Sequence, residues 1–109
     1  MSKRGSASNY STGIRAEKSV ASTYSSHGWS VKQSPGSRGA ADLTCSKGSV
    51  THYVQVKSST TSAKPYISSS EAGRLKSTAT RNDATPVVAK VHHGAQNISY
   101  AKSGHAVKF

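Results

Sequence analysis

The sequence predicts an α/β domain in which a mixed central sheet is flanked by helices. Two stretches place apolar residues at helical spacing, the first over residues 14–27 and the second from about residue 68 to residue 81. Short runs rich in Val, Thr and Tyr lie between and after them and are typical of strands. The expected order is therefore helix, three strands, helix, two strands, within one domain of residues 14–109.

Residues 1–13 are rich in Ser, Gly, Asn and basic side chains, a composition that predicts a flexible N-terminal arm. Lys3 and Arg4 lie in this arm. They either touch a phosphate backbone or simply keep the tail soluble.

The first predicted helix ends at Gly28, a residue that favours helix C-termini. One face of this helix carries Ile14, Glu17, Val20, Ala21 and Tyr24. An acid in an apolar stripe costs free energy unless it is paired or binds a cation. Glu17 is thus either a functional acid or the ion-pair partner of Arg15 or Lys18.

A β-hairpin is predicted over residues 41–57, with its turn at Lys47 and Gly48. That turn would bring Asp42 roughly opposite Tyr53, one diagonal step from Gln55. Gln55 and Lys57 are two residues apart on a strand and leave the same face of the sheet. An acid, an amide and a lysine then share one patch, which suits a divalent cation beside a lysine.

The remaining segments follow from local signals. Residues 29–33 alternate weakly as a strand, and residues 34–39 form a loop of small residues that includes Arg38. A polar loop carrying Lys64 precedes a capping box formed by Ser68 and Glu71, so that Glu71 is expected to cap the second helix. Residues 86–91 read as a buried strand, residues 92–94 as a turn with exposed imidazoles, and residues 97–102 as the last strand.

The charge balance is strongly basic. The chain has 109 residues, 15 Lys and Arg against 4 Asp and Glu, and a net charge of +11. This favours a polyanionic partner, nucleic acid first and an anionic membrane surface second. The sequence lacks a signal peptide and a membrane-spanning stretch, which predicts a cytoplasmic protein. The hydrophobic content of 33% predicts a thin core, so a homodimer is expected.

Cys45 is the one cysteine of the chain, which excludes an internal disulfide and a thiolate zinc cluster. Its place on a predicted strand favours a small core residue over a nucleophile.

A helix supplying one acid, a hairpin supplying Asp and X-Lys, and a helix crossing to another strand together form the core of the restriction-endonuclease-like, or PD-(D/E)XK, fold. Within that fold the sequence resembles the archaeal Holliday junction resolvases from about residue 13 to residue 102. Residues 13–18 resemble the opening helix with its catalytic Glu. Residues 34–38 resemble the loop before the catalytic Asp, Asp42 matches that Asp, and residues 54–57 resemble the Glu-Val-Lys strand. Residues 73–75 and 86–91 match the later helix and strand.

The resemblance implies Mg²⁺-dependent hydrolysis of DNA phosphodiesters, with Mn²⁺ as a possible substitute. It makes Asp42 the central metal ligand, completed by Gln55, the Val56 carbonyl and Glu17, with Lys57 orienting the attacking water. Phosphate contacts are then expected from basic and small polar residues: Lys3, Arg4, Arg15, Lys18, Ser34, Ser37, Arg38, Lys64 and Arg74.

Gln55 departs from the family pattern, because most members have Glu at this position. A Gln-X-Lys motif also resembles Mrr-like restriction nucleases. Three functions therefore stay open: a resolvase acting on branched DNA, another nuclease of the same fold (restriction-like, or a toxin cutting DNA or tRNA), and a non-catalytic DNA-binding protein on this scaffold.

Overall fold

A computed structural model describes residues 4–33, 41–59, 62 and 64–109, with side chains from residue 14 onward. The predicted order of elements is confirmed. The elements are α1 Arg4–Ser26, β1 Ser30–Gln33, β2 Leu43–Lys47, β3 Val50–Ser59, α2 Ser69–Arg81, β4 Thr85–His92 and β5 Ala95–Tyr100.

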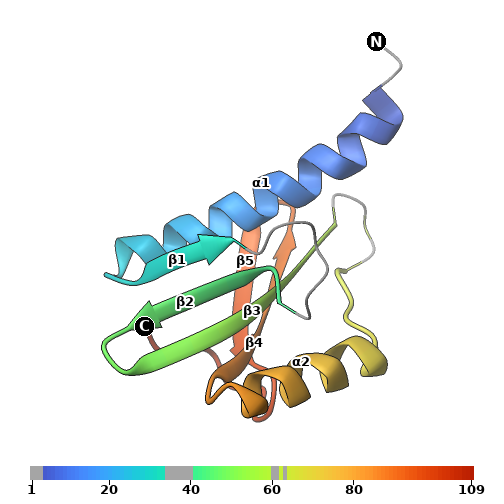
Figure 1. Cartoon of the computed structure of the whole chain (residues 1–109). Coiled ribbons are helices and arrows are strands. Elements are labelled where there is room, and N and C mark those ends of the chain that lie inside the picture. Colours follow the sequence, from blue (N-terminus) through green and yellow to red (C-terminus); the bar gives the residue numbers. More distant parts are fainter. Residues whose placement is uncertain (1–3, 34–40, 60–61, 63) are drawn as a thin grey trace.

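The five strands form one mixed sheet in the order β1-β2-β3-β4-β5. All neighbouring strands are antiparallel except β3 and β4, which are parallel. Parallel neighbours need a long crossover connection, and α2 provides it. Helix α1 lies across one face of the sheet and α2 lies on the other (Figure 1).

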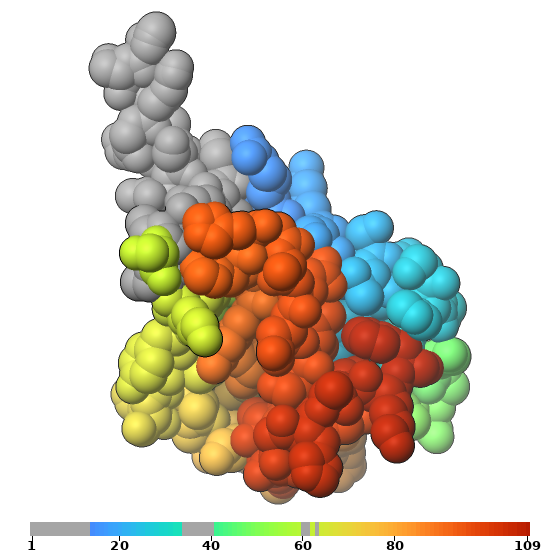
Figure 2. Space-filling model, turned by 180° about the vertical axis from the view of Figure 1, so that it is seen from behind, coloured from blue at the N-terminus to red at the C-terminus, as the bar shows by residue number. Residues whose placement is uncertain are grey.

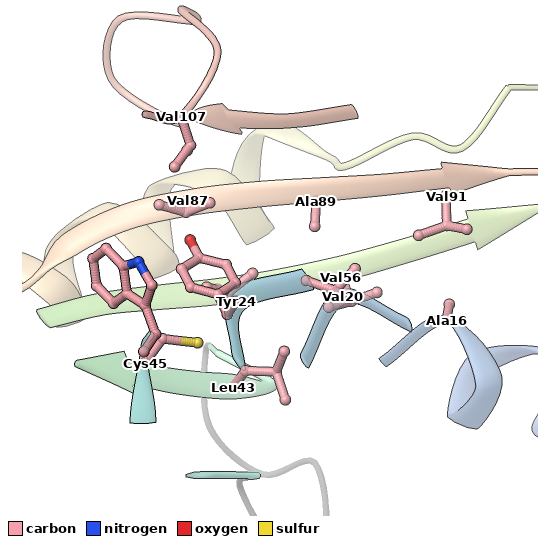
Figure 3. Close-up of a cluster of buried hydrophobic side chains, with 12 residues drawn as sticks. Ala16, Val20, Tyr24, Leu43, Cys45, Val56, Val87, Ala89, Val91 and Val107 are labelled. Atoms are coloured by element: carbon pink, nitrogen blue, oxygen red, sulfur yellow. The ribbon is translucent and has the colours of Figure 1, made fainter. Parts of the chain in front are cut away.

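The main core lies between α1 and the sheet (Figure 3). Ala16, Val20 and Tyr24 recur at helical spacing and are buried, so that they form the inner face of α1. They pack on side chains from all the central strands, including Leu43, Cys45, Val54, Val56, Val87, Ala89 and Val91. Most of these side chains are small, and the core is correspondingly thin.

A smaller cluster lies on the opposite face, beneath α2. Leu75 is fully buried there against Ala41 and Val88, with Tyr53 and Ile67 at its edge. Strand β3 therefore alternates: His52, Val54 and Val56 face α1, while the half-buried residues between them face the α2 side. The apolar cluster on the α2 side is the smaller of the two, and polar side chains of β3 share this face with it.

Cys45 is buried in the main core, as predicted. Burial raises the pKa of its thiol to about 12, so the reactive thiolate is scarce at neutral pH. None of the described helices is long and apolar enough to cross a membrane.

Two predicted boundaries are wrong. Helix α1 begins at Arg4, ten residues before the expected start, so most of the expected flexible arm has a helical backbone. Once a helix is nucleated by packing, each further residue adds a hydrogen bond, and even weak helix formers can continue it. Strand β5 begins at Ala95 because His93 and Gly94 alone make the turn, both with positive φ.

The register of the central hairpin also differs from the prediction. Lys47 pairs with Val50, so the two-residue turn is Gly48-Ser49, with Gly48 at φ 62°. Tyr53 consequently lies opposite Thr44 rather than Asp42. A slip of one turn position changes the pairing by two residues, which keeps every side chain on its predicted face. It moves Asp42 along β3 toward Gln55.

Candidate active site

Asp42 immediately precedes β2 and is fixed to β3 at two points. Its backbone N–H donates to the Val54 carbonyl at 2.8 Å. Its carboxylate Oδ2 accepts a hydrogen bond from the Val56 N–H, also at 2.8 Å. The backbone on either side of Gln55 therefore holds Asp42, and the predicted neighbourhood of Asp42, Gln55 and Val56 is present.

Lys57 leaves β3 on the same face as Gln55, as the strand period predicts. Its ammonium does not project freely into solvent. The Lys57 Nζ donates to Glu71 Oε2 at 2.6 Å, in an ion pair whose side chains are 26% and 38% exposed. The lysine of the strand motif is thus tied to the first turn of α2.

Glu71 occupies position N3 of α2 and completes the capping box that the sequence predicts. The Ser68 hydroxyl accepts from the Glu71 N–H, while Glu71 Oε1 accepts from the Ser68 N–H at 3.1 Å. The ion pair with Lys57, followed by the Ser68 N–H, lowers the pKa of Glu71. Sequence reasoning treated this residue only as a cap and missed its contact with the site.

Glu17 approaches the site from α1. Its carboxyl is half-buried, and burial followed by the charge of Asp42 raises its pKa. The second effect requires the two carboxylates to be within electrostatic reach of each other. Glu17 and Asp42, which lie 25 residues apart in the sequence, are thus within electrostatic reach of each other.

Burial also raises the pKa of Asp42, and the negative charge of Glu71 adds to the increase. The Val56 N–H and the positive charge of Lys57 act in the opposite direction without cancelling it. A raised pKa means that the ionised form of the Asp42 carboxyl is less stable in the folded protein than in water. A bound cation would relieve this cost.

The available oxygens suit a hard divalent cation but do not form a cage of carboxylates. Within the described residues, no three His, Cys, Asp or Glu side chains lie close enough to hold a metal ion by themselves. Any cation bound by Asp42 must therefore draw on amide, carbonyl or water oxygens, which Mg²⁺ accepts readily. Gln55 and the Val56 peptide, both beside Asp42, supply such groups.

A polar groove adjoins this face of the sheet. Lys57 pairs with Lys90 of β4, so the two lysines are neighbours on the same face. Lys90 also lines a groove of about 470 Å³ with Lys64, His92 and Asn97. In Figure 2 the segment before α2, in yellow-green, lies beside the orange β4–β5 hairpin that forms the other wall. Lys64 thus lines the same groove as Lys90, the strand neighbour of Lys57, and Lys90 is a basic residue that sequence reasoning did not include.

The other expected phosphate contacts are more dispersed. Arg15 and Lys18 are exposed on α1, and Arg74 is exposed on α2, on the other side of the sheet. Arg4 contributes its backbone to α1. Lys3, Ser34, Ser37 and Arg38 lie outside the described residues.

The mixed sheet with a helix on each face, and the order of its elements, give the chain the restriction-endonuclease-like, or PD-(D/E)XK, fold that the sequence predicts. The sequence also matches the profile of a family described as archaeal Holliday junction resolvase (Hjc), over residues 8–103. The chain belongs to this family and is a junction-resolving nuclease, as the sequence predicted.

A solved structure agrees with this assignment. Hjc, a Holliday junction resolvase from the archaeal hyperthermophile Archaeoglobus fulgidus, superposes with a TM-score of 0.72 at 18% sequence identity. The match covers 88% of this chain and 78% of that one. No curated protein sequence matches the chain. Members of the resolvase family act on branched DNA and generally use a divalent metal ion.

Proposed function

We propose that this chain is a Mg²⁺-dependent endonuclease that cuts four-way DNA junctions as a homodimer, with Asp42 at the centre of its metal site. Gln55, the Val56 carbonyl and Glu17 complete the protein ligands, and Mn²⁺ can replace Mg²⁺. The observation that carries this proposal is the double attachment of Asp42 to β3, beside Gln55 and Val56.

The charges of the site support a metal role for these residues. Both carboxyls are partly buried, burial raises the pKa of each, and the charge of Asp42 adds to the increase for Glu17. A divalent cation, when bound, neutralises developing negative charge and makes its bound water a better nucleophile. The all-oxygen donor set matches the preference of Mg²⁺ over that of softer metals.

The chain's own groups have distinct tasks in hydrolysis. The oxygen of a water molecule bonds to phosphorus, and the bond between phosphorus and the leaving sugar oxygen breaks. The positive charge of Lys57 reaches Asp42, where it offsets part of the increase in the pKa of that carboxyl. Lys57 can therefore orient the water and stabilise charge on the phosphoryl oxygens. The Val56 N–H keeps the Asp42 carboxylate oriented throughout.

The DNA backbone would follow the basic face next to the site. Lys57, Lys90 and Lys64 offer successive positive charges along β3, β4 and the adjoining groove. Arg15, Lys18 and Arg74 extend the positive surface over both helices. We assign further phosphate contacts to Ser34, Ser37, Arg38, Lys3 and Arg4. The net charge of +11 supports affinity that depends mainly on phosphates.

A homodimer follows from the substrate, because a four-way junction presents two equivalent strands to cut and a two-fold assembly matches them. The DNA substrate also supports a cytoplasmic location.

The direct test uses four substrates of similar length: a four-way junction, a linear duplex, single-stranded DNA and tRNA. Each is incubated with Mg²⁺, Mn²⁺ or EDTA. Paired cuts in the junction alone, with either metal and not with EDTA, are the expected result. Cuts in tRNA or in all duplexes would favour the toxin or restriction-like alternative. Tight junction binding without cuts would favour the non-catalytic scaffold, for which the neutral Gln55 is the supporting observation.

A further inference from the structure

The acids of this chain are few and unevenly placed. The sequence contains 4 Asp and Glu residues against 15 Lys and Arg. The charge of Asp42 reaches Glu17, and the charge of Glu71 reaches Asp42, whereas the fourth acid, Asp83, is exposed in the turn after α2. In a chain so short of negative charge, two acids that share one lysine need a reason.

Glu71 is the member of this group that the nuclease motif does not include. It comes from α2 rather than from the hairpin or α1, yet it makes the shortest contact of the site, 2.6 Å from Oε2 to the Lys57 Nζ. Its other oxygen, Oε1, accepts from the backbone and hydroxyl of Ser68 at 3.1 and 3.2 Å. The carboxylate therefore has little freedom to rotate and presents Oε2 to Lys57 in a fixed direction.

Lys57 has a second acid within reach. The positive charge of Lys57 is felt by Asp42, whose Oδ2 is already engaged by the Val56 N–H. If Glu71 carried no charge, Asp42 would be the strongest remaining attraction for the ammonium, because residue 55 is a neutral Gln. An ammonium paired with Asp42 would compete with any cation for the same oxygens.

We propose that Glu71 is a positioning residue of the nuclease site, which supplies the negative charge that residue 55 lacks and holds the Lys57 ammonium away from Asp42. The inference rests on the proposed function, since it assigns Lys57 and Asp42 to phosphodiester hydrolysis. In this chain, positions 55 and 71 share one role, and a carboxylate is needed at one of the two positions. A glutamate at either position would satisfy it.

The test is a double-mutant cycle of wild type, Glu71→Gln, Gln55→Glu and the double variant. Glutamine is accepted at N3 of a capping box, so Glu71→Gln removes the charge and keeps the helix cap. At saturating Mg²⁺, Glu71→Gln should slow junction cleavage about tenfold, within the usual coupling range for residues in contact. Adding Gln55→Glu to Glu71→Gln should restore most of the loss, with the Gln55→Glu single variant as the reference for the double variant.

A second readout needs neither DNA nor metal. In nitrogen-15 NMR, the Lys57 ammonium of the wild type should give a signal protected from solvent exchange, which Glu71→Gln loses and the double variant regains. Asp83→Asn is the matched control: it removes the same negative charge from an exposed turn residue and should leave both the Lys57 signal and the cleavage rate at the wild-type level.

The outcomes separate the two proposals. A wild type that cuts no junction, but whose Lys57 signal follows the predicted pattern, overturns the proposed function and retains the charge arrangement. Wild-type cleavage together with a Glu71→Gln variant that matches wild type in both readouts overturns the positioning role. Loss of activity in Glu71→Gln that Gln55→Glu does not restore also overturns it, because the shared role would then be absent.

Discussion

Asp42 has a structural role, as acceptor for the Val56 N–H, and a proposed chemical role, as metal ligand. Two substitutions distinguish these roles. Asp42→Asn keeps an amide oxygen that can accept from the Val56 N–H, whereas Asp42→Ala removes the acceptor. Both substitutions remove the same negative charge. The difference in stability between the two variants therefore reports mainly on the hydrogen bond.

The magnitude follows from the burial of the site. A buried donor left without its acceptor costs about 1–3 kcal/mol, and for half-buried Asp42 the lower half of that range applies. In a domain of this size, about 1 kcal/mol shifts the melting temperature by roughly 4–8 °C. Asp42→Asn should therefore melt several degrees above Asp42→Ala. It should also melt at or above wild type, because ionised Asp42 is disfavoured in the folded state.

Activity should behave differently from stability. Both variants should lose junction cleavage by more than about a thousandfold, since each lacks the central metal-binding carboxylate. Asp83→Asn is the matched control: it removes the same charge from an exposed turn residue at φ 54°, a conformation that Asn tolerates, and should leave cleavage and melting unchanged. Thermal unfolding and single-turnover cleavage measure these effects. Equal melting temperatures for the two Asp42 variants, or normal cleavage by Asp42→Asn, would refute the reasoning.

Further predictions concern the metal, the DNA and the pH. Gln55→Glu should lower the Mg²⁺ concentration for half-maximal cleavage, because an ionic ligand replaces a neutral one. Gln55→Ala should raise that concentration, because the ligand is lost. Superimposable titrations would exclude Gln55 as a ligand. Junction affinity should fall about a thousandfold or more between about 50 and 200 mM salt, with a shallower slope after Lys64→Gln or Lys90→Gln; a flat wild-type profile would contradict a phosphate-dominated interface. Burial lowers the pKa of His52, so unfolding takes up a proton, and stability should be complete above about pH 6.5 and decline below it. His52→Phe should flatten that decline in a pH series of denaturant unfolding, and an unchanged slope would assign the effect to other groups.

Local patterns predicted most of this fold correctly because the interactions that set them are local. The capping box of Ser68 and Glu71 spans three residues, and the alternation of Val54, Gln55 and Val56 reflects the strand period. The same period placed Gln55 and Lys57 on one face, although the hairpin register was wrong. A register error of two residues preserves the faces, so Gln55 and Lys57 keep their predicted face and Asp42 still lies beside β3.

Two features could not be predicted from the sequence: the exact turn position of the central hairpin and the contact between Lys57 and Glu71. Gly48 can occupy either central position of a two-residue turn, and only the folded backbone shows that it precedes Ser49. The pairing of Lys57 with Glu71 depends on how α2 lies across the sheet, and no spacing along the chain indicates it. The scarcity of acids was the available signal. With 4 Asp and Glu against 15 Lys and Arg, a basic partner is expected for a half-buried acid such as Glu71.

The central claim, a two-fold nuclease that resolves junctions, is tested most directly on a supercoiled plasmid with one extruded cruciform, which is a four-way junction in a closed circle. Two cuts made within one bound complex convert the plasmid to a linear form, whereas single independent cuts release supercoiling and abolish the junction. With Mg²⁺, the wild type should give linear product at the cruciform without a build-up of nicked circles, and Asp42→Asn should give neither. Nicked circles as the sole product, or linear product from a plasmid that lacks the cruciform, would contradict the account.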